Sequence, residues 1–322
     1  MDSQFPNFEE AELILPEGQT VPDALMSRAK PYYISREGTR LRVLHVSAAT
    51  DQPRGSLIFS PGRTEFIEKY LESIEDFSKR GFAVFVVDPR GQGLSDRPLA
   101  DTVISYVRDF QEYSDDLGFA VKEFEPLLPK PHILLGHSMG GTIVLQSVLS
   151  GVINPSAVIT SAPMLGLFDL EAPMMNWVVK FLSFIGLRTK DLPFQKQRNG
   201  EPIAFEVNKL TSDPDRYAKW AAFFQTIPRL RVGAPSFGWI SAAMKAMAYV
   251  NRNADKLKIP SLVVAAGADP IVDPASNRNF AVQSGSTFQI VPGALHELMM
   301  ERDVYRDQFF DHFDQFLKDN AL

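Results

Sequence analysis

The chain has 322 residues, of which 45% are apolar and 22% charged, values ordinary for a globular protein with one large domain or one domain carrying an insertion. Its formal net charge of −6 argues against nucleic acid as the principal partner, because phosphate binding requires clustered positive charge. The absence of cysteine excludes disulfides, thiolate zinc sites and a cysteine nucleophile.

The first residues, 1–30, are rich in Pro, Glu and Asp and are predicted to form an irregular arm over the surface. They begin MDSQFPNFEE, which lacks the basic and then apolar segments of a secretion signal. The sequence has no run of about 18 uninterrupted apolar residues, so we predict no transmembrane helix. Together with the lack of cysteine, this favours a cytoplasmic protein and leaves peripheral contact with the inner face of the membrane open.

From Tyr32 onward, strand and helix patterns alternate along the chain. The segment YYISREGTRLRVLHVSA, centred on Glu37 and Gly38, predicts an antiparallel hairpin. Short apolar runs then predict buried strands, and apolar residues at helical spacing predict the helices between them. The predicted strands are SLIFSPG, FAVFVVDPRG, HILLGHS and SAVITSAP, and the predicted helices are 64–81, 103–124 and 139–151.

The alternation stops in a Met-, Phe- and Pro-rich segment that has several short helical patterns and no clear strand. It resumes with SLVVAAGADP, a helix near 275–282, the strand STFQIVPG and a last helix near 305–317. These units predict an α/β fold, a doubly wound and mostly parallel sheet with one helical insertion. The predicted organisation is an arm at 1–30, a core of 31–162 and 251–322, and a helical cap at 163–250.

The pentapeptide Gly136-His137-Ser138-Met139-Gly140 lies between a predicted buried strand and a predicted helix. It has the G-x-S-x-G pattern of a nucleophile on a strained strand-to-helix turn, where side chains in place of the glycines would clash with neighbouring strands. The helix that starts at Met139 directs free N–H groups toward charge developing beside Ser138. Glycine and serine also occur in ordinary loops, so the flanking strand and helix carry the prediction that Ser138 is a nucleophile.

A serine nucleophile needs a general base and an acid that orients it. His296 follows the last predicted strand through a Pro-Gly turn, at the carboxyl edge of the sheet where ligands bind, and is the predicted base. Asp269 ends the preceding strand and is the predicted acid, while the alternative, Asp273, has the more ordinary role of capping the next helix. The remaining histidines are interpreted as structural or surface residues: His45, His132, His137 and His312.

Two backbone N–H groups are predicted to stabilise the oxyanion, those of Met139 and of Arg63, which lies in the loop after SLIFSPG. The side chain of Arg63 either adds positive charge near the site or is an ordinary surface arginine. The sequence shows no metal-ligand spacing, no phosphate-binding glycine loop and no cofactor fingerprint. We therefore predict neither a metal nor a cofactor.

With these motifs the sequence resembles the α/β-hydrolase superfamily, and within it the serine hydrolases of the monoacylglycerol lipase and bacterial lysophospholipase type. The order of serine, acid and histidine is the one that this superfamily uses. The resemblance spans about residues 55–305 and is carried by SPGRTEFIEKY, DPRGQGLSDR, GHSMGG, GADPIVD and GALHELMMER. Two segments of the insertion, FEVNKLTSDPDRYAKW and GAPSFGWI, are most similar to the bacterial lysophospholipase branch.

The resemblance implies the same site that the residues predict. It assigns Ser138 as nucleophile, Asp269 as acid, His296 as base, and Arg63 with Met139 as oxyanion donors. This chain departs from many relatives at Pro61-Gly62, where they have His-Gly.

The predicted cap, 163–250, is expected to lie over the site because it leaves the sheet directly after a strand. Its segment PMMNWVVKFLSFIGL indicates either an acyl-chain channel or membrane-touching lid, or simply the core of the cap itself. The cap holds 11 Lys and Arg against 7 Asp and Glu, which suits an amphiphile with an anionic head group, although such residues also form ordinary solvated faces. The candidate substrate contacts are Met164, Met174, Trp177 and Phe181.

These observations predict a serine carboxylic ester hydrolase that releases a fatty acid from a lysophospholipid or monoacylglycerol through an acyl-enzyme. The expected partner is thus a small lipid-like ester, and the oligomeric state is left open. A serine peptidase of the prolyl aminopeptidase type is the first alternative, and a non-catalytic binding protein is less favoured because no triad member is missing. Epoxide hydrolases and haloalkane dehalogenases have aspartate in place of Ser138 and are disfavoured.

Overall fold

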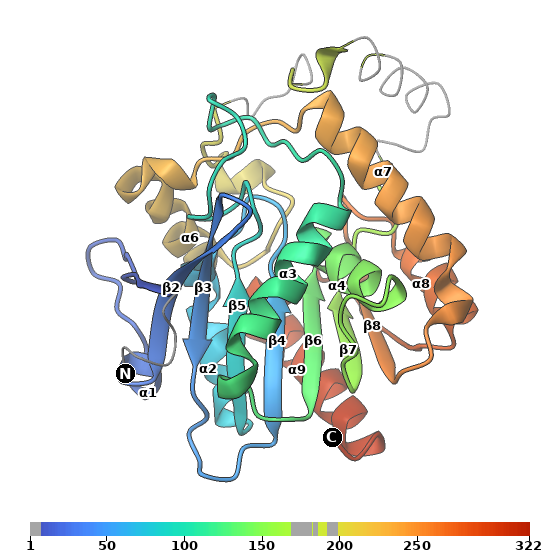
Figure 1. The fold of residues 1–322 in the computed structure, drawn as a ribbon. Helices are drawn as coiled ribbons and strands as arrows, with labels where there is room; N and C mark the ends of the chain where they lie inside the picture. The colour runs from blue at the N-terminus through green and yellow to red at the C-terminus, as the bar shows by residue number, and fades with distance from the viewer. Residues whose placement is uncertain (1–7, 169–181, 183–185, 192–198) are drawn as a thin grey trace.

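The computed structural model describes residues 8–168, 182, 186–191 and 199–322, and its central feature is one sheet of nine strands (Figure 1). The strand order is β1-β2-β3-β5-β4-β6-β7-β8-β9. The first pairs, up to β3 with β5, are antiparallel, and every pair from β5 to β9 is parallel. The strands are β1 Glu9–Glu10, β2 Ala29–Arg36, β3 Thr39–Val46, β4 Gly55–Ser60, β5 Phe82–Val87, β6 His132–His137, β7 Ala157–Ser161, β8 Ser261–Ala266 and β9 Thr287–Val291.

Helices cover both faces of this sheet and bury its apolar strands (Figure 1). One face packs against α3, α4, α7 and α8, and the other against α2 and α9. Because both faces are covered, a central strand such as β5, FAVFVV, is buried along its whole length. The helices are α1 Asp23–Met26, α2 Leu71–Lys79, α3 Gln111–Phe124, α4 Met139–Leu149, α6 Pro214–Thr226, α7 Phe237–Arg252, α8 Pro274–Ser284 and α9 Asp303–Asp319.

The predicted α/β fold with a mostly parallel, doubly wound sheet is confirmed. The hairpin turn is also where the sequence predicts it, since Glu37 and Gly38 both have positive φ between β2 and β3. Two predicted helix boundaries were wrong. The helix predicted over 64–81 starts with a 3-10 turn at Ile67–Tyr70 and is an α-helix only over Leu71–Lys79. The helix predicted over 103–124 begins only at Gln111. Residues before it pair with a distant segment instead, because Ser105 N–H donates to Ala234 and Ser105 accepts from Ser236. Tertiary pairing here overrides the apolar periodicity.

The N-terminal arm is held by a buried ion pair beneath it. The Arg42 and Glu68 side chains are both fully buried, and Arg42 Nη2 lies 2.6 Å from Glu68 Oε1. Arg42 Nη2 also donates to the carbonyl of Glu12, and the Ile14 N–H donates to Glu68 Oε1. The pair therefore ties residues 12–14 to the sheet.

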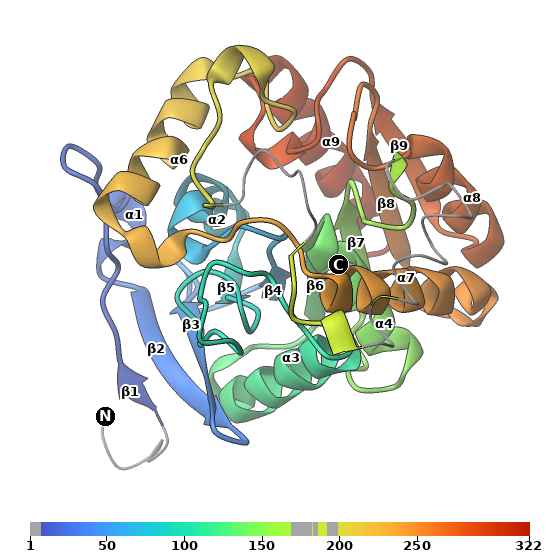
Figure 2. The same cartoon turned by 90° about the horizontal axis from the view of Figure 1, so that it is seen from above.

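Two helices from the segment predicted as a cap lie near the carboxyl edge of the sheet, α6 on the side of α2 and α7 beside α4 (Figure 2). Helix α6 contributes Trp220 and Phe224 to a small apolar cluster with Phe66, which follows β4. Helix α7 is part of the main core, where its Trp239 ring packs edge-on against Phe110. The bounds 163–250 for a separate cap stay a prediction.

Candidate active site

Ser138 lies at the turn from β6 into α4, in a backbone conformation that few non-glycine residues adopt. Its φ is 53° and its ψ is −118°, which places the side chain on a strained turn of the kind that functional sites retain. Two glycines make the turn possible. A Cβ at Gly136 would overlap the Gly140 backbone, and a Cβ at Gly140 would overlap the Ser60 carbonyl at the end of β4.

The structure brings Ser138, His296 and Asp269 into one hydrogen-bonded line. His296 Nε2 is 2.8 Å from Ser138 Oγ, and His296 Nδ1 is 2.6 Å from Asp269 Oδ2. Asp269 follows β8 and His296 follows β9, so neighbouring parallel strands deliver both residues to the carboxyl edge beside Ser138. The second oxygen of Asp269, Oδ1, accepts the backbone N–H groups of Ile271 and Val272, which fixes the carboxylate toward His296.

The pKa of His296 is raised above its usual value although the ring is buried. Burial by itself lowers this pKa. The negative charge and hydrogen bond of Asp269 raise it, as do the charges of Glu297 and Glu65, and together they outweigh the effect of burial. The protonated imidazole is therefore stabilised in place. A histidine in this setting can take a proton from Ser138 and hold it while charge develops elsewhere.

Two free backbone N–H groups flank Ser138. Among the groups that the structure describes, neither the N–H of Arg63 nor that of Met139 has a hydrogen-bond acceptor. Met139 is the first residue of α4, where N–H groups are left without intrahelical partners. Gly62, next to Arg63, lies so close to Ser138 that a Cβ on it would sit 3.2 Å from the Ser138 Cβ. The N–H groups of Arg63 and Met139 are thus free of acceptors among the described residues, and their role as oxyanion donors stays a prediction.

A buried cluster of charged groups packs against the loop that contains Gly62 and Arg63. Glu65 accepts the Gly62 N–H and the Tyr70 hydroxyl through one oxygen, and Lys69 through the other at 2.9 Å. Lys69 also lies 2.6 Å from Glu297, the residue after His296. Although burial alone would raise it, the pKa of Glu65 is lowered to about 2, with Lys69 the main cause. The cluster links the loop at Gly62 and Arg63 to the chain that carries His296.

The sequence did not predict this cluster or several residues that line the cavity. The Glu65–Lys69 pair has the i, i+4 spacing of a local ion pair, which was the available signal. Its connection to Glu297, 228 residues away, has no sequence signal. Trp220 and Phe224 on α6 also share i, i+4 spacing, but such a pair predicts an apolar core equally well.

Ser138 and His296 open into a cavity of about 540 Å³, a volume suited to a small-molecule ligand. Its lining combines polar groups near the nucleophile with apolar side chains farther out. The apolar lining residues are Ile203, Val207, Leu210, Trp220, Phe224, Val232 and Ile271. Of the predicted substrate contacts, Met164 is buried in the main core and does not line this cavity. Met174, Trp177 and Phe181 lie outside the described residues.

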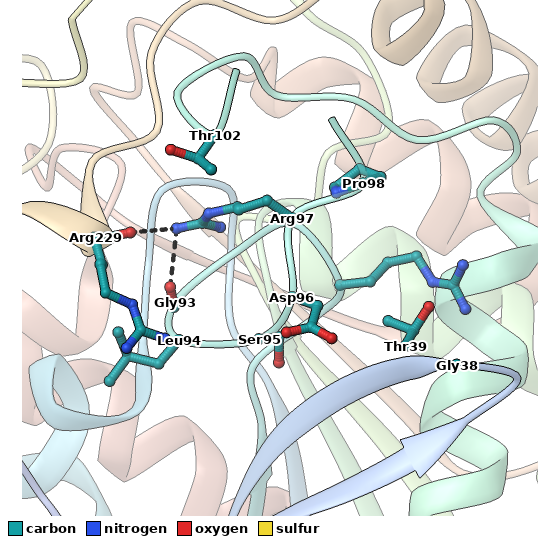
Figure 3. Close-up of a pocket in the computed structure, with 11 residues that line it drawn as sticks. Gly38, Thr39, Gly93, Leu94, Ser95, Asp96, Arg97, Pro98, Thr102 and Arg229 are labelled. Atoms are coloured by element: carbon teal, nitrogen blue, oxygen red, sulfur yellow. Dashed lines mark hydrogen bonds between the residues drawn. The ribbon is translucent and has the colours of Figure 1, made fainter. Parts of the chain in front are cut away.

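A second cavity, of about 370 Å³, contains no member of the triad (Figure 3). It is formed by the β2–β3 turn, the loop after β5 and Arg229. Arg97 Nη2 donates to the carbonyls of Gly93 and Arg229, both at 2.9 Å, and so joins that loop to the chain after α6 (Figure 3). We assign this cavity no role in the chemistry at Ser138.

The other histidines do not contact Ser138 Oγ in the structure. His137 is buried and turned away, with Nδ1 3.0 Å from the Ser161 carbonyl, and burial lowers its pKa to about 4. His45 and His132 each contact a backbone carbonyl, and His312 lies half-buried on α9. In the part of the chain that the structure describes, no helix has the length and apolar character to cross a membrane. The same residues contain no cluster of His, Asp and Glu able to hold a metal ion.

A mostly parallel, doubly wound sheet with Ser138, His296 and Asp269 in line at its carboxyl edge defines a serine hydrolase of the α/β-hydrolase class. Comparison with known proteins agrees. A family model described as serine aminopeptidase, S33, matches residues 51–303, and the chain belongs to this family.

Relatives and solved structures give the same class. The chain is 31% identical to lysophospholipase L2 of Escherichia coli over 270 residues, covering 78% of this chain and 76% of the relative. It is 26% identical to a monoacylglycerol lipase of Mycolicibacterium smegmatis, covering 85% and 92%. Its fold matches the crystal structure of a soluble variant of monoglyceride lipase from Saccharomyces cerevisiae, with a TM-score of 0.72, 20% identity, and coverage of 95% and 100%. The predicted family, fold class and enzyme class, a serine ester hydrolase, are confirmed.

Proposed function

We propose that the protein hydrolyses the carboxylic ester of a single-chain lipid, a lysophospholipid or a monoacylglycerol. The observation that carries this proposal is the unbroken line from Asp269 through His296 to Ser138, opening beside two free N–H groups into a cavity with apolar walls. The names of the relatives, lysophospholipase and monoacylglycerol lipase, support the same substrate class.

The proposed reaction has two halves. Ser138 Oγ attacks the ester carbonyl while His296 Nε2 takes its proton, and the carbonyl oxygen becomes an oxyanion between the N–H groups of Arg63 and Met139. The tetrahedral intermediate collapses as His296 returns the proton to the leaving alcohol. Water then attacks the acyl-serine, with His296 again accepting and returning the proton, and the fatty acid leaves. Asp269 holds the imidazole and stabilises its charge throughout.

The acidic side chains of the cavity favour an ester over a peptide substrate. An aminopeptidase needs a carboxylate free to bind the substrate's amino group. In the described lining, Glu65 and Glu297 both pair with Lys69, and Glu201 lies 3.1 Å from Arg231. Each of these carboxylates therefore already has a cationic partner.

A substrate panel and one variant test the proposal. Wild-type protein and Ser138→Ala are assayed on lysophospholipids, monoacylglycerols, short p-nitrophenyl esters and aminoacyl amides. We expect ester turnover and fluorophosphonate labelling in the wild type only, with unchanged circular dichroism in the variant. Full ester hydrolysis by Ser138→Ala would refute the mechanism, and turnover confined to aminoacyl amides would favour a peptidase.

Peripheral membrane contact through 163–250 and a cytoplasmic location belong to the same proposal, because single-chain lipid esters arise in membranes. Co-sedimentation with anionic vesicles measures this contact. The absence of any bound fraction would contradict it without bearing on the ester hydrolysis.

A further inference from the structure

Arg63 carries a positive charge that no described carboxylate neutralises. Within residues 8–168, 182, 186–191 and 199–322, no acidic group forms an ion pair with it. Two fully buried cations, by contrast, are paired, Lys69 with Glu65 and Glu297, and Arg42 with Glu68. Arg63 is half-buried and lines the cavity beside Ser138, so an anionic group bound in that cavity can pair with it without displacing another carboxylate.

The guanidinium of Arg63 is held in place but keeps unused donors. Its Nη1 donates to the Gly233 carbonyl at 2.8 Å, and its Cζ lies 5.7 Å from the centre of the Trp239 ring. Its Nε and Nη2 make no hydrogen bond to any described group, and Arg63 lines the same cavity as Ser138. Burial lowers the pKa of Arg63 to about 10, so the side chain still carries its charge at neutral pH.

The backbone and the side chain of Arg63 can contact two parts of the same substrate, the scissile ester and the phosphate. The backbone N–H of Arg63 is a proposed oxyanion donor, and its guanidinium stands at the end of the same side chain. In a lysophospholipid, the acyl ester and the phosphate are separated by the glycerol backbone, a similar number of bonds to that between an arginine's backbone nitrogen and its guanidinium carbon. A carbonyl bound at the backbone of Arg63 thus brings a phosphate within reach of its side chain.

We infer that the side chain of Arg63 forms an anion subsite that selects lysophospholipids over uncharged monoacylglycerols. The inference rests on the proposed ester hydrolysis and adds the residue that decides between its two substrates. Arginine suits this role because its planar fork binds two phosphate oxygens at once. Lys209, an exposed residue that also lines the cavity, is the competing candidate for the same contact.

The test compares kcat/KM for a lysophospholipid with kcat/KM for the monoacylglycerol of the same acyl chain, within each variant. Any disturbance of the oxyanion site by Arg63→Gln slows both substrates and cancels in the ratio. We expect Arg63→Gln to lower the ratio by about 10- to 100-fold, the range of a hydrogen bond to a charged group. Arg63→Lys keeps the charge but lacks the planar fork, so we expect its ratio to lie between those of the wild type and Arg63→Gln. It also provides a second test if the glutamine variant folds poorly.

Arg229→Gln is the matched control, because it removes an exposed arginine from the second cavity (Figure 3). We expect its ratio to stay within twofold of the wild type. A ratio within threefold of the wild type in Arg63→Gln would overturn the inference. So would a ratio that falls in Lys209→Gln instead.

Inhibition separates this inference from the proposed function and identifies the source of the anion. Decyl phosphate below its micellar concentration is expected to inhibit p-nitrophenyl butyrate hydrolysis by the wild type, and at least tenfold more weakly in Arg63→Gln. Inorganic phosphate is expected to inhibit far less, because it lacks the acyl-like chain. Equal inhibition of both proteins by decyl phosphate would overturn the subsite, whereas a wild type that hydrolyses neither lipid would refute the proposed substrates and leave this second measurement to decide on the subsite.

Discussion

Replacing Asp269 by asparagine is expected to trap His296 in the wrong tautomer. Oδ1 of Asp269 accepts two backbone N–H groups, from Ile271 and Val272, at 2.8 and 3.0 Å. An asparagine here must keep its carbonyl oxygen in that position, so its amide nitrogen faces His296 Nδ1 and donates to it. The imidazole proton then moves to Nε2, which can no longer accept the proton of Ser138.

Two effects set the size of the loss. Asp269 and His296 are nearly fully buried and 2.6 Å apart. With charge centres about 4 Å apart and an effective dielectric constant of about 20, their attraction in the protonated state is about 4 kcal/mol. That energy corresponds to about 10³ in rate, and the wrong tautomer brings the expected fall in kcat/KM to about 10⁴.

The assay is the steady-state hydrolysis of p-nitrophenyl butyrate, with thermal unfolding measured alongside. Asp273→Asn is the matched control, because Asp273 caps α8 by accepting from Ala275 and Ser276, and asparagine is also a good cap. We expect the control to retain activity within threefold and both variants to remain folded. Activity of Asp269→Asn within tenfold of the wild type would refute the assigned role of Asp269.

Three further predictions concern pH, packing and stability. The pKa of His296 is raised in the fold and only the neutral ring acts as base, so activity should fall as pH drops through a value above the ordinary value of about 6.5. A midpoint below that ordinary value in the kcat/KM profile would contradict this. Gly140→Ala places a Cβ against the Ser60 carbonyl, so we expect a loss of about 1–3 kcal/mol in unfolding free energy and about 10² in kcat/KM, and a fully active variant would argue against the close contact. Glu68→Gln leaves the buried guanidinium of Arg42 without its counter-charge and should cost about 3–5 kcal/mol in urea unfolding, whereas a loss under 1 kcal/mol would show the pair to be unimportant.

Much of the fold was predictable because its signals are local. Strands buried on both faces require continuous apolar runs, so the sequence predicts β4 to β8. The glycines around Ser138 mark a turn that other residues cannot make. Chain order then restricts the acid and base to the ends of late strands, which is why the sequence predicts Asp269 and His296.

The sequence by itself determined the fold class, the buried strands from β4 to β8 and the identity of the triad candidates. Only the tertiary structure decided what surrounds them, since those contacts join residues far apart in the chain. The link from Lys69 to Glu297 spans 228 positions and that from Arg63 to Gly233 spans 170. Periodicity also failed at 103–110, where pairing with the chain near Ala234 replaces a helix. The lack of an ion-pair partner for Arg63 among the described residues is likewise a property of the tertiary structure, because the candidate partners lie far apart in the chain.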